Sequence, residues 1–99
     1  MSNIRQEPPW RRKPDPALPK VGARLALTRR ALSLTRFQMA QLLGTDMPTW
    51  GTYEAGLVRI PPDEALKLSA SGIPLDWVYE GKMGNLHPHI RAKIASFAG

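Results

Sequence analysis

The sequence predicts an all-helical domain, and three observations support this fold class. No segment alternates apolar and polar residues with a period of two, which is the pattern of a half-buried strand. Apolar residues recur instead at spacings of three and four. Glycines and prolines separate these stretches at places where short helices begin and end. We therefore expect a compact bundle of five helices, preceded by a basic arm and followed by one extra helix.

The chain has 99 residues and a formal net charge of +6, all of which lies at its N-terminal end. Residues 1–30 carry eight Lys or Arg residues against two carboxylates, whereas the remaining residues carry six charges of each sign. This asymmetry indicates a polyanionic partner, because counterion release makes each phosphate contact favourable at low salt. The alternative is a basic tail that only keeps the protein soluble.

Several classes of protein find no support in the sequence. The chain has no cysteine, so it has no disulfide, no thiolate metal site and no thiol nucleophile. His87 and His89 flank Pro88 too closely for two ligands of one helical zinc site, and no nucleophile lies beside a base. No apolar run is long enough to span a membrane, and no signal-peptide core is present. We expect a cytoplasmic, nucleoid-associated protein that is not an enzyme and needs neither metal nor cofactor.

Residues 1–19 form a Pro-rich basic arm that holds five of the ten prolines. Proline fixes φ and removes a backbone donor, so we expect this arm to be extended and largely disordered on its own. Its centre reads P-P-W-R-R-K-P, in which Trp10 precedes Arg11, Arg12 and Lys13. The three cations are candidate contacts to a DNA backbone or minor groove. Trp10 is equally suited to lie along DNA or to fold back onto the domain.

The helical pattern begins at Lys20. Val21, Leu25, Arg29 and Leu32 share one face of this first helix. Arg29 is a charge on an apolar stripe, and an unpaired buried charge is costly. We therefore expect a carboxylate partner for Arg29 further along the chain.

The next two helices have clear start and stop signals. T-R-F-Q is a capping box that begins a helix at Thr35, and Gly44 suits the left-handed residue that ends it. Asp46 or Met47 then caps a third helix, with Pro48 in its first turn and its end at Gly56. The inner faces of these two helices are expected to carry Met39, Ala40, Leu43, Trp50 and Tyr53.

Three more helices are expected after Gly56. One begins near Pro61 and runs to about Ser71, a short one lies between Pro74 and Gly81, and a final one begins at Pro88. The apolar residues expected inside are Ala65, Leu66 and Leu68 in the first of these, and Ile90, Ile94 and Phe97 in the last.

Four segments in this order resemble the helix-turn-helix proteins of the Cro and lambda-repressor-like family, often called the Xre family. V-G-A-R-L-A-L-T-R-R is similar to the first helix of the family and L-T-R-F-Q-M-A-Q-L-L-G to the second. T-W-G-T-Y-E-A-G resembles the third helix and I-P-L-D-W-V-Y-E-G the fifth. The resemblance implies a DNA-binding domain over residues 20–81, followed by a linker and C-terminal helix over residues 82–99.

The resemblance also implies roles for individual residues. Arg29 would pair with Glu54 in a partly buried structural salt bridge. The third helix would enter the major groove with its N-terminal end first. Arg36 and Arg59 would contact phosphates. The outward-facing positions of the third helix would be Met47, Pro48, Gly51 and Thr52, with Thr49 near the DNA backbone.

The expected function is a sequence-specific, DNA-binding transcriptional regulator of bacterial or phage origin, and a repressor in particular. It would bind double-stranded DNA as a homodimer, with no membrane association and with room for a regulatory protein partner. The stripe of Ile90, Ile94 and Phe97 is either the dimer seam or part of the domain's own core. The alternative function is a protein-interaction module, such as an antitoxin or co-regulator, which an exposed Phe37 and the weakly polar third helix would fit. A third reading is a nucleoid-type binder without sequence preference.

Overall fold

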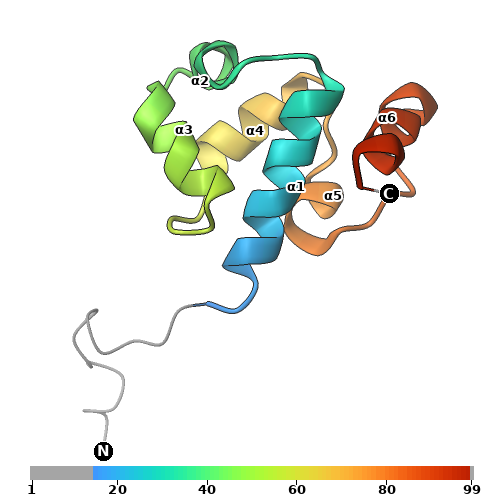
Figure 1. Cartoon of the computed structure of the whole chain (residues 1–99), viewed down its shortest axis with the longest axis horizontal. Coiled ribbons are helices and arrows are strands. Elements are labelled where there is room, and N and C mark those ends of the chain that lie inside the picture. The colour runs from blue at the N-terminus through green and yellow to red at the C-terminus, as the bar shows by residue number, and fades with distance from the viewer. Residues whose placement is uncertain (1–14, 99) are drawn as a thin grey trace, which may run out of the picture.

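The computed structural model describes residues 15–98, and within this range the chain is all-helical, as the sequence predicts. Figure 1 shows the helices packed into one globule with the N-terminal end of α1 at its lower edge. No strand occurs among the described residues. The six helices are α1 (Leu18–Ala31), α2 (Arg36–Leu43), α3 (Met47–Glu54), α4 (Pro62–Ala70), α5 (Leu75–Glu80) and α6 (Pro88–Ala98).

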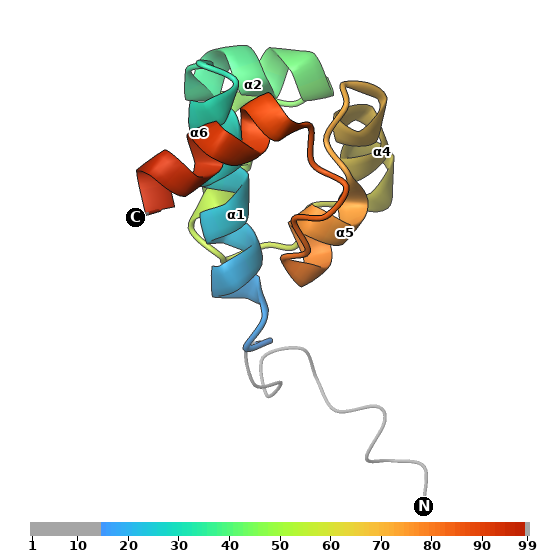
Figure 2. The same cartoon turned by 90° about the vertical axis from the view of Figure 1, so that its right-hand side faces the viewer.

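Helix α1 is the centre of the fold. It packs against α3 on one side and against α5 and α6 on the other, as Figures 1 and 2 show. Val21 and Leu25 of α1 are buried in the core, as the helical spacing predicts. Thr28 is fully buried too, and its hydroxyl donates to the Arg24 carbonyl at 2.7 Å and accepts from Trp77 Nε1 at 2.9 Å. This polar pair is satisfied inside the core and joins α1 to α5.

Helix α1 begins at Leu18, two residues before the start that the sequence indicates. Pro19 therefore lies in the first turn rather than in the arm. A proline is tolerated there because the first backbone donors of a helix have no partner within it. Asp15 supports the start of the helix, since its side chain accepts from the backbone N–H of Ala17 at 2.9 Å.

Helices α2 and α3 follow the start and stop signals of the sequence. Thr35 Oγ1 accepts from the N–H of Gln38 at 3.1 Å, and the Gln38 side chain accepts from the N–H of Thr35 at 2.9 Å, which is the expected capping box. Gly44 ends α2 at a φ of 72°, in the left-handed region. Asp46 caps α3 by accepting from the N–H of Thr49 at 2.8 Å. The turn between the two helices is therefore fixed at both ends.

Lys67 and Arg24 donate hydrogen bonds to backbone carbonyls at the C-terminal ends of two helices. Lys67 Nζ donates to the Leu43 carbonyl at 2.9 Å, at the end of α2. Arg24 donates from Nε to the Val78 carbonyl at 3.0 Å and from Nη2 to the Tyr79 carbonyl at 3.2 Å, near the end of α5. A cation at a helix C-terminus satisfies orphan carbonyls and opposes the negative end of the helix dipole. Both contacts join α-helices that are distant in sequence.

Two of the apolar residues that the sequence places inside the domain lie at its surface. Leu66 is 59% exposed, because Ala65 and Leu68 already form the inner face of α4 and Leu66 lies about 100° around the helix from Ala65. Phe97 is 48% exposed, whereas Ile94 on the same helix is buried. Ile94 therefore belongs to the domain's own core through the packing of α6 on α1. No helix among residues 15–98 is both long and apolar enough to cross a membrane.

The contact between α1 and α3 depends on a glycine. A Cβ atom at Gly22 would lie 2.6 Å from the carbonyl oxygens of both Tyr53 and Glu54. These are backbone atoms at the end of α3, so they cannot move aside as the tip of a side chain would. The absence of a side chain at Gly22 thus sets how closely the two helices approach.

We expect Gly22→Ala to destabilise the domain by about 2 kcal/mol, because it forces α1 away from α3. Gly51→Ala is the matched control, since Gly51 lies in α3 with no atom within 4 Å of the added Cβ. This control should stabilise the protein by about 0.5–1 kcal/mol through the higher helix propensity of alanine. Urea unfolding followed by circular dichroism measures both. Equal effects of the two substitutions would contradict the close approach at Gly22.

Candidate nucleic-acid interface

The carboxylate of Glu54 joins three helices at the end of α3. Glu54 Oε2 accepts from Arg29 Nε of α1 at 2.6 Å, and it also accepts from Nε1 of Trp50. Glu54 Oε1 accepts from Arg36 Nε of α2 at 3.2 Å and from Arg29 Nη2 at 3.4 Å. The ion pair expected between Arg29 and Glu54 is therefore present, with side chains only 12% and 7% exposed. Arg29 further donates from Nη1 to the Leu34 carbonyl at 3.0 Å, which fixes the connection between α1 and α2.

The surroundings of Glu54 act on its pKa in opposite directions. Burial on its own would raise the pKa of this carboxyl, because a charge is poorly solvated there. The hydrogen bonds from Arg29 and Trp50, the charge of Arg29 and the hydrogen bond from Arg36 outweigh burial and hold the pKa below its ordinary value. Glu54 is thus ionised at neutral pH, and its charge balances the charge of the largely buried Arg29.

The outer surface of α3 is largely apolar. Met47 is 48% exposed, Pro48 is exposed, and Gly51 has open space above it. These three residues line a hollow of about 540 Å³ between α1, α2 and α3, together with Ala26, Arg36, Glu54 and Ala55. The sequence-predicted outward positions 47, 48 and 51 are therefore brought together beside Arg36.

The polar candidates on α3 are more constrained than their residue types indicate. Thr52 Oγ1 donates to the Thr49 carbonyl at 2.6 Å, so its proton is used within the helix and only its acceptor side is open to a base. Thr49 is half-buried next to the N-terminus of α3. Asp46 is exposed there, and its pKa is lowered because the carboxylate accepts hydrogen bonds from Thr49. This fixed negative charge disfavours a phosphate directly at the start of α3.

The candidate phosphate contacts are already engaged within the protein. Arg36 is 57% exposed, and within residues 15–98 its only side-chain hydrogen bond is the one from Nε to Glu54, so its terminal guanidinium nitrogens have no partner in this range. Arg59 pairs through Nη2 with Asp15, and the two side chains are 50% and 37% exposed, respectively. Arg11, Arg12 and Lys13 lie outside the described residues. Of the two candidate arginines that lie within residues 15–98, Arg36 and Arg59, only Arg36 lines the hollow beside α3.

The sequence does not predict the roles of two residues in this arrangement, Trp50 and Asp15. Trp50 and Glu54 are four residues apart on α3, a spacing that brings their side chains together, yet Trp50 was expected only to fill the core. Asp15 was assigned to the arm, although it pairs with Arg59 and supports the start of α1. No cluster of three or more His, Asp or Glu side chains suited to a metal ion occurs among residues 15–98.

Comparisons of the chain with protein-family models, with curated proteins and with solved structures found no match.

We expect Glu54→Gln to lower the free energy of unfolding by about 2 kcal/mol or more, because it leaves the buried guanidinium of Arg29 without a counter-charge. The amide oxygen still accepts from Trp50, so the packing is nearly unchanged. Arg36→Gln removes the exposed partner of the same carboxylate and should cost less than about 1 kcal/mol. Chemical denaturation of the two variants tests this ranking, and a larger loss for Arg36→Gln would refute it.

The lowered pKa of Glu54 predicts a pH dependence of stability. A carboxyl with a lower pKa in the folded than in the unfolded state stabilises the fold above its unfolded pKa, about 4.3 for Glu, and loses this contribution as the pH falls through the folded value. The difference in unfolding free energy between the wild type and Glu54→Gln should therefore shrink as the pH falls below about 5, from just above the unfolded pKa of Glu through its lower folded pKa. Denaturant titrations across this range measure it. A difference that stays constant would show that Glu54 does not titrate with folding.

Proposed function

We propose that this chain is a sequence-specific, DNA-binding transcriptional regulator with a lambda-repressor-like helix-turn-helix. In this proposal α2 and α3 form the motif, and α3 enters the major groove with its N-terminal end first. The observation that carries the proposal is the fixed geometry of α3. Asp46 holds its first turn, the Glu54 cluster holds its last, and the surface between them is open beside Arg36.

The chemistry of this surface favours particular contacts. Met47 and Pro48 can pack against the 5-methyl group of thymine, which is exposed in the major groove. Arg36 stands at the start of α2, where its free guanidinium nitrogens can contact a phosphate. The basic residues before Pro14 add affinity for the phosphate backbone. Base reading by such a surface is limited, so two copies binding half-sites about 34–36 Å apart would supply the specificity.

A protein-interaction module is the second candidate function. Phe37 and Met47 are 57% and 48% exposed, and exposed large apolar side chains on neighbouring helices are typical of protein interfaces. In this case a partner protein would cover α2 and α3 in place of DNA.

Selection of bound duplexes from a random DNA pool at physiological salt distinguishes these functions. Enrichment of a short palindrome supports a dimeric, sequence-specific regulator. Retention without enrichment would mean that phosphate contacts dominate and that the protein binds DNA without sequence preference. No retention of any duplex would refute the DNA-binding proposal and leave the protein-interaction module.

We expect Arg36→Ala to weaken DNA binding and to reduce the slope of log affinity against log salt by about one, because one phosphate contact is lost. Arg91→Ala removes an exposed cation from α6, away from the hollow beside α3, and is the matched control. Fluorescence anisotropy with a labelled duplex at several salt concentrations measures both variants. The same slope for Arg36→Ala and the wild type would exclude a phosphate contact at Arg36.

A further inference from the structure

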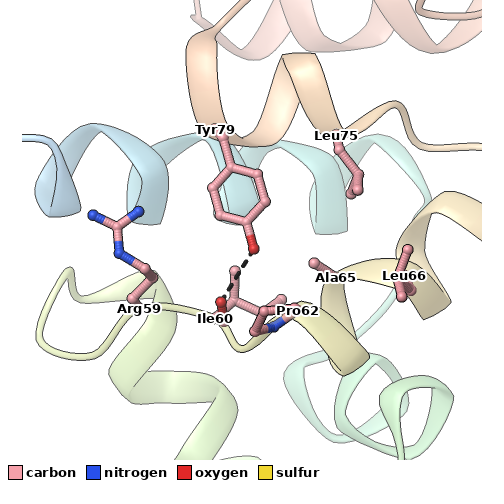
Figure 3. Close-up of a pocket in the computed structure, with 7 residues that line it drawn as sticks. All are labelled: Arg59, Ile60, Pro62, Ala65, Leu66, Leu75 and Tyr79. Atoms are coloured by element: carbon pink, nitrogen blue, oxygen red, sulfur yellow. Dashed lines mark hydrogen bonds between the residues drawn. The ribbon is translucent and has the colours of Figure 1, made fainter.

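A second hollow, which shares no lining residue with the one beside α3, lies between the connection after α3 and helices α4 and α5 (Figure 3). It has a volume of about 350 Å³, and Pro62, Leu66, Leu75 and Tyr79 form most of its wall. The Tyr79 hydroxyl donates to the Ile60 carbonyl at 3.1 Å, so its hydrogen is already used. The tyrosine therefore offers its ring to an occupant. A wall of this kind suits a flat apolar group such as an aromatic side chain.

An ion pair anchors the end of the arm, at Asp15, to the edge of this pocket. Arg59 is one of the lining residues and pairs with Asp15, the first described residue. Trp10 lies five residues before Asp15. An extended chain spans about 3.3–3.6 Å per residue, so Trp10 has a reach of roughly 17 Å from the anchor at Arg59. This reach is ample for a return to the pocket.

The charges around the pocket complement those of the arm. From Pro61 to Glu80 the chain carries four carboxylates and one ammonium, and the flanking cations Arg59 and Lys82 pair with Asp15 and Glu80. The ammonium, that of Lys67, is held by the Leu43 carbonyl. Asp63 follows the lining residue Pro62, and Glu80, which already pairs with Lys82 Nζ at 3.0 Å, follows the lining residue Tyr79. Arg11, Arg12 and Lys13 directly follow Trp10, so a docked arm would bring three cations to this acidic surface.

We propose that the pocket between α4 and α5 receives Trp10 of the chain's own arm. The indole ring packs against the apolar wall. The cations that follow Trp10 lie against the carboxylates of α4 and α5. The Asp15–Arg59 pair anchors the other end of the segment from Trp10 to Asp15. Docking withdraws Arg11, Arg12 and Lys13 from any polyanion. The docking itself is independent of the proposed function. Only its consequence, a competition between the pocket and DNA for the arm, rests on that function.

Acrylamide quenching of tryptophan fluorescence tests the docking without DNA. The chain has three tryptophans, and Trp50 and Trp77 are only 0% and 5% exposed, so quenching in the native protein reports chiefly on Trp10. We expect little quenching of the wild type. Leu66→Lys replaces an exposed wall residue by a cation that repels the arm, and it should make one indole quenchable without loss of fold. Adding Trp10→Phe to Leu66→Lys should remove that quenchable component.

Leu42→Lys is the matched control, because Leu42 is a 43% exposed leucine of α2 that does not line the pocket. It should leave quenching at the wild-type level. A wild-type indole quenched as readily as free N-acetyltryptophanamide would overturn the proposal. Equal protection in Leu66→Lys would overturn it too, and protection that disappears on dilution would mean that the pocket holds the arm of a second copy instead.

Discussion

The carboxylate of Glu54 is the constraint on which the rest of this structure depends. It is the last residue of α3, and it accepts hydrogen bonds from α1 through Arg29, from α2 through Arg36 and from α3 itself through Trp50. A buried charge is stable only when it is paired and hydrogen-bonded, and here both members of the Arg29 pair meet that condition. This group links the end of α3 to both α1 and α2, and the bare backbone of Gly22 allows the close approach of α1 to α3.

Much of this arrangement is readable from the sequence, because local signals and packing agree. The capping box at Thr35 and the left-handed Gly44 lie where the sequence predicts them, and of the two expected caps, Asp46 and Met47, it is Asp46 that caps α3. Each of these features needs only residues within one turn. Arg29 on an apolar stripe signalled a buried ion pair, and the family resemblance indicated Glu54 as its partner. The prediction that Leu66 and Phe97 are buried was wrong, because an apolar residue at the edge of a stripe is buried only if a neighbouring helix covers it. The Asp15–Arg59 pair joins residues that are 44 positions apart in the sequence, so no local sequence pattern predicts it.

Several cations within residues 15–98 are engaged in hydrogen bonds inside the domain, which limits how many can contact a polyanion. Arg24, Arg29 and Lys67 donate to carbonyls or to Glu54 inside the domain. Their charges stabilise the fold and leave Arg36 as the cation beside the apolar surface of α3. In the proposed function the basic residues of the arm therefore supply much of the affinity, and α3 supplies shape and apolar contact. A pocket that holds Trp10 would then regulate affinity without altering the helix-turn-helix itself.

NMR mapping of a DNA duplex on the folded protein would show whether α3 contacts DNA. A 15N-labelled sample would be titrated with a short duplex at physiological salt, and amide shifts would be followed along the whole chain. We expect large changes at residues 47 and 49–52 and at Arg36, together with changes in the arm. Changes confined to the arm would show that α3 does not contact DNA. The absence of changes at any residue would contradict the proposed DNA-binding function.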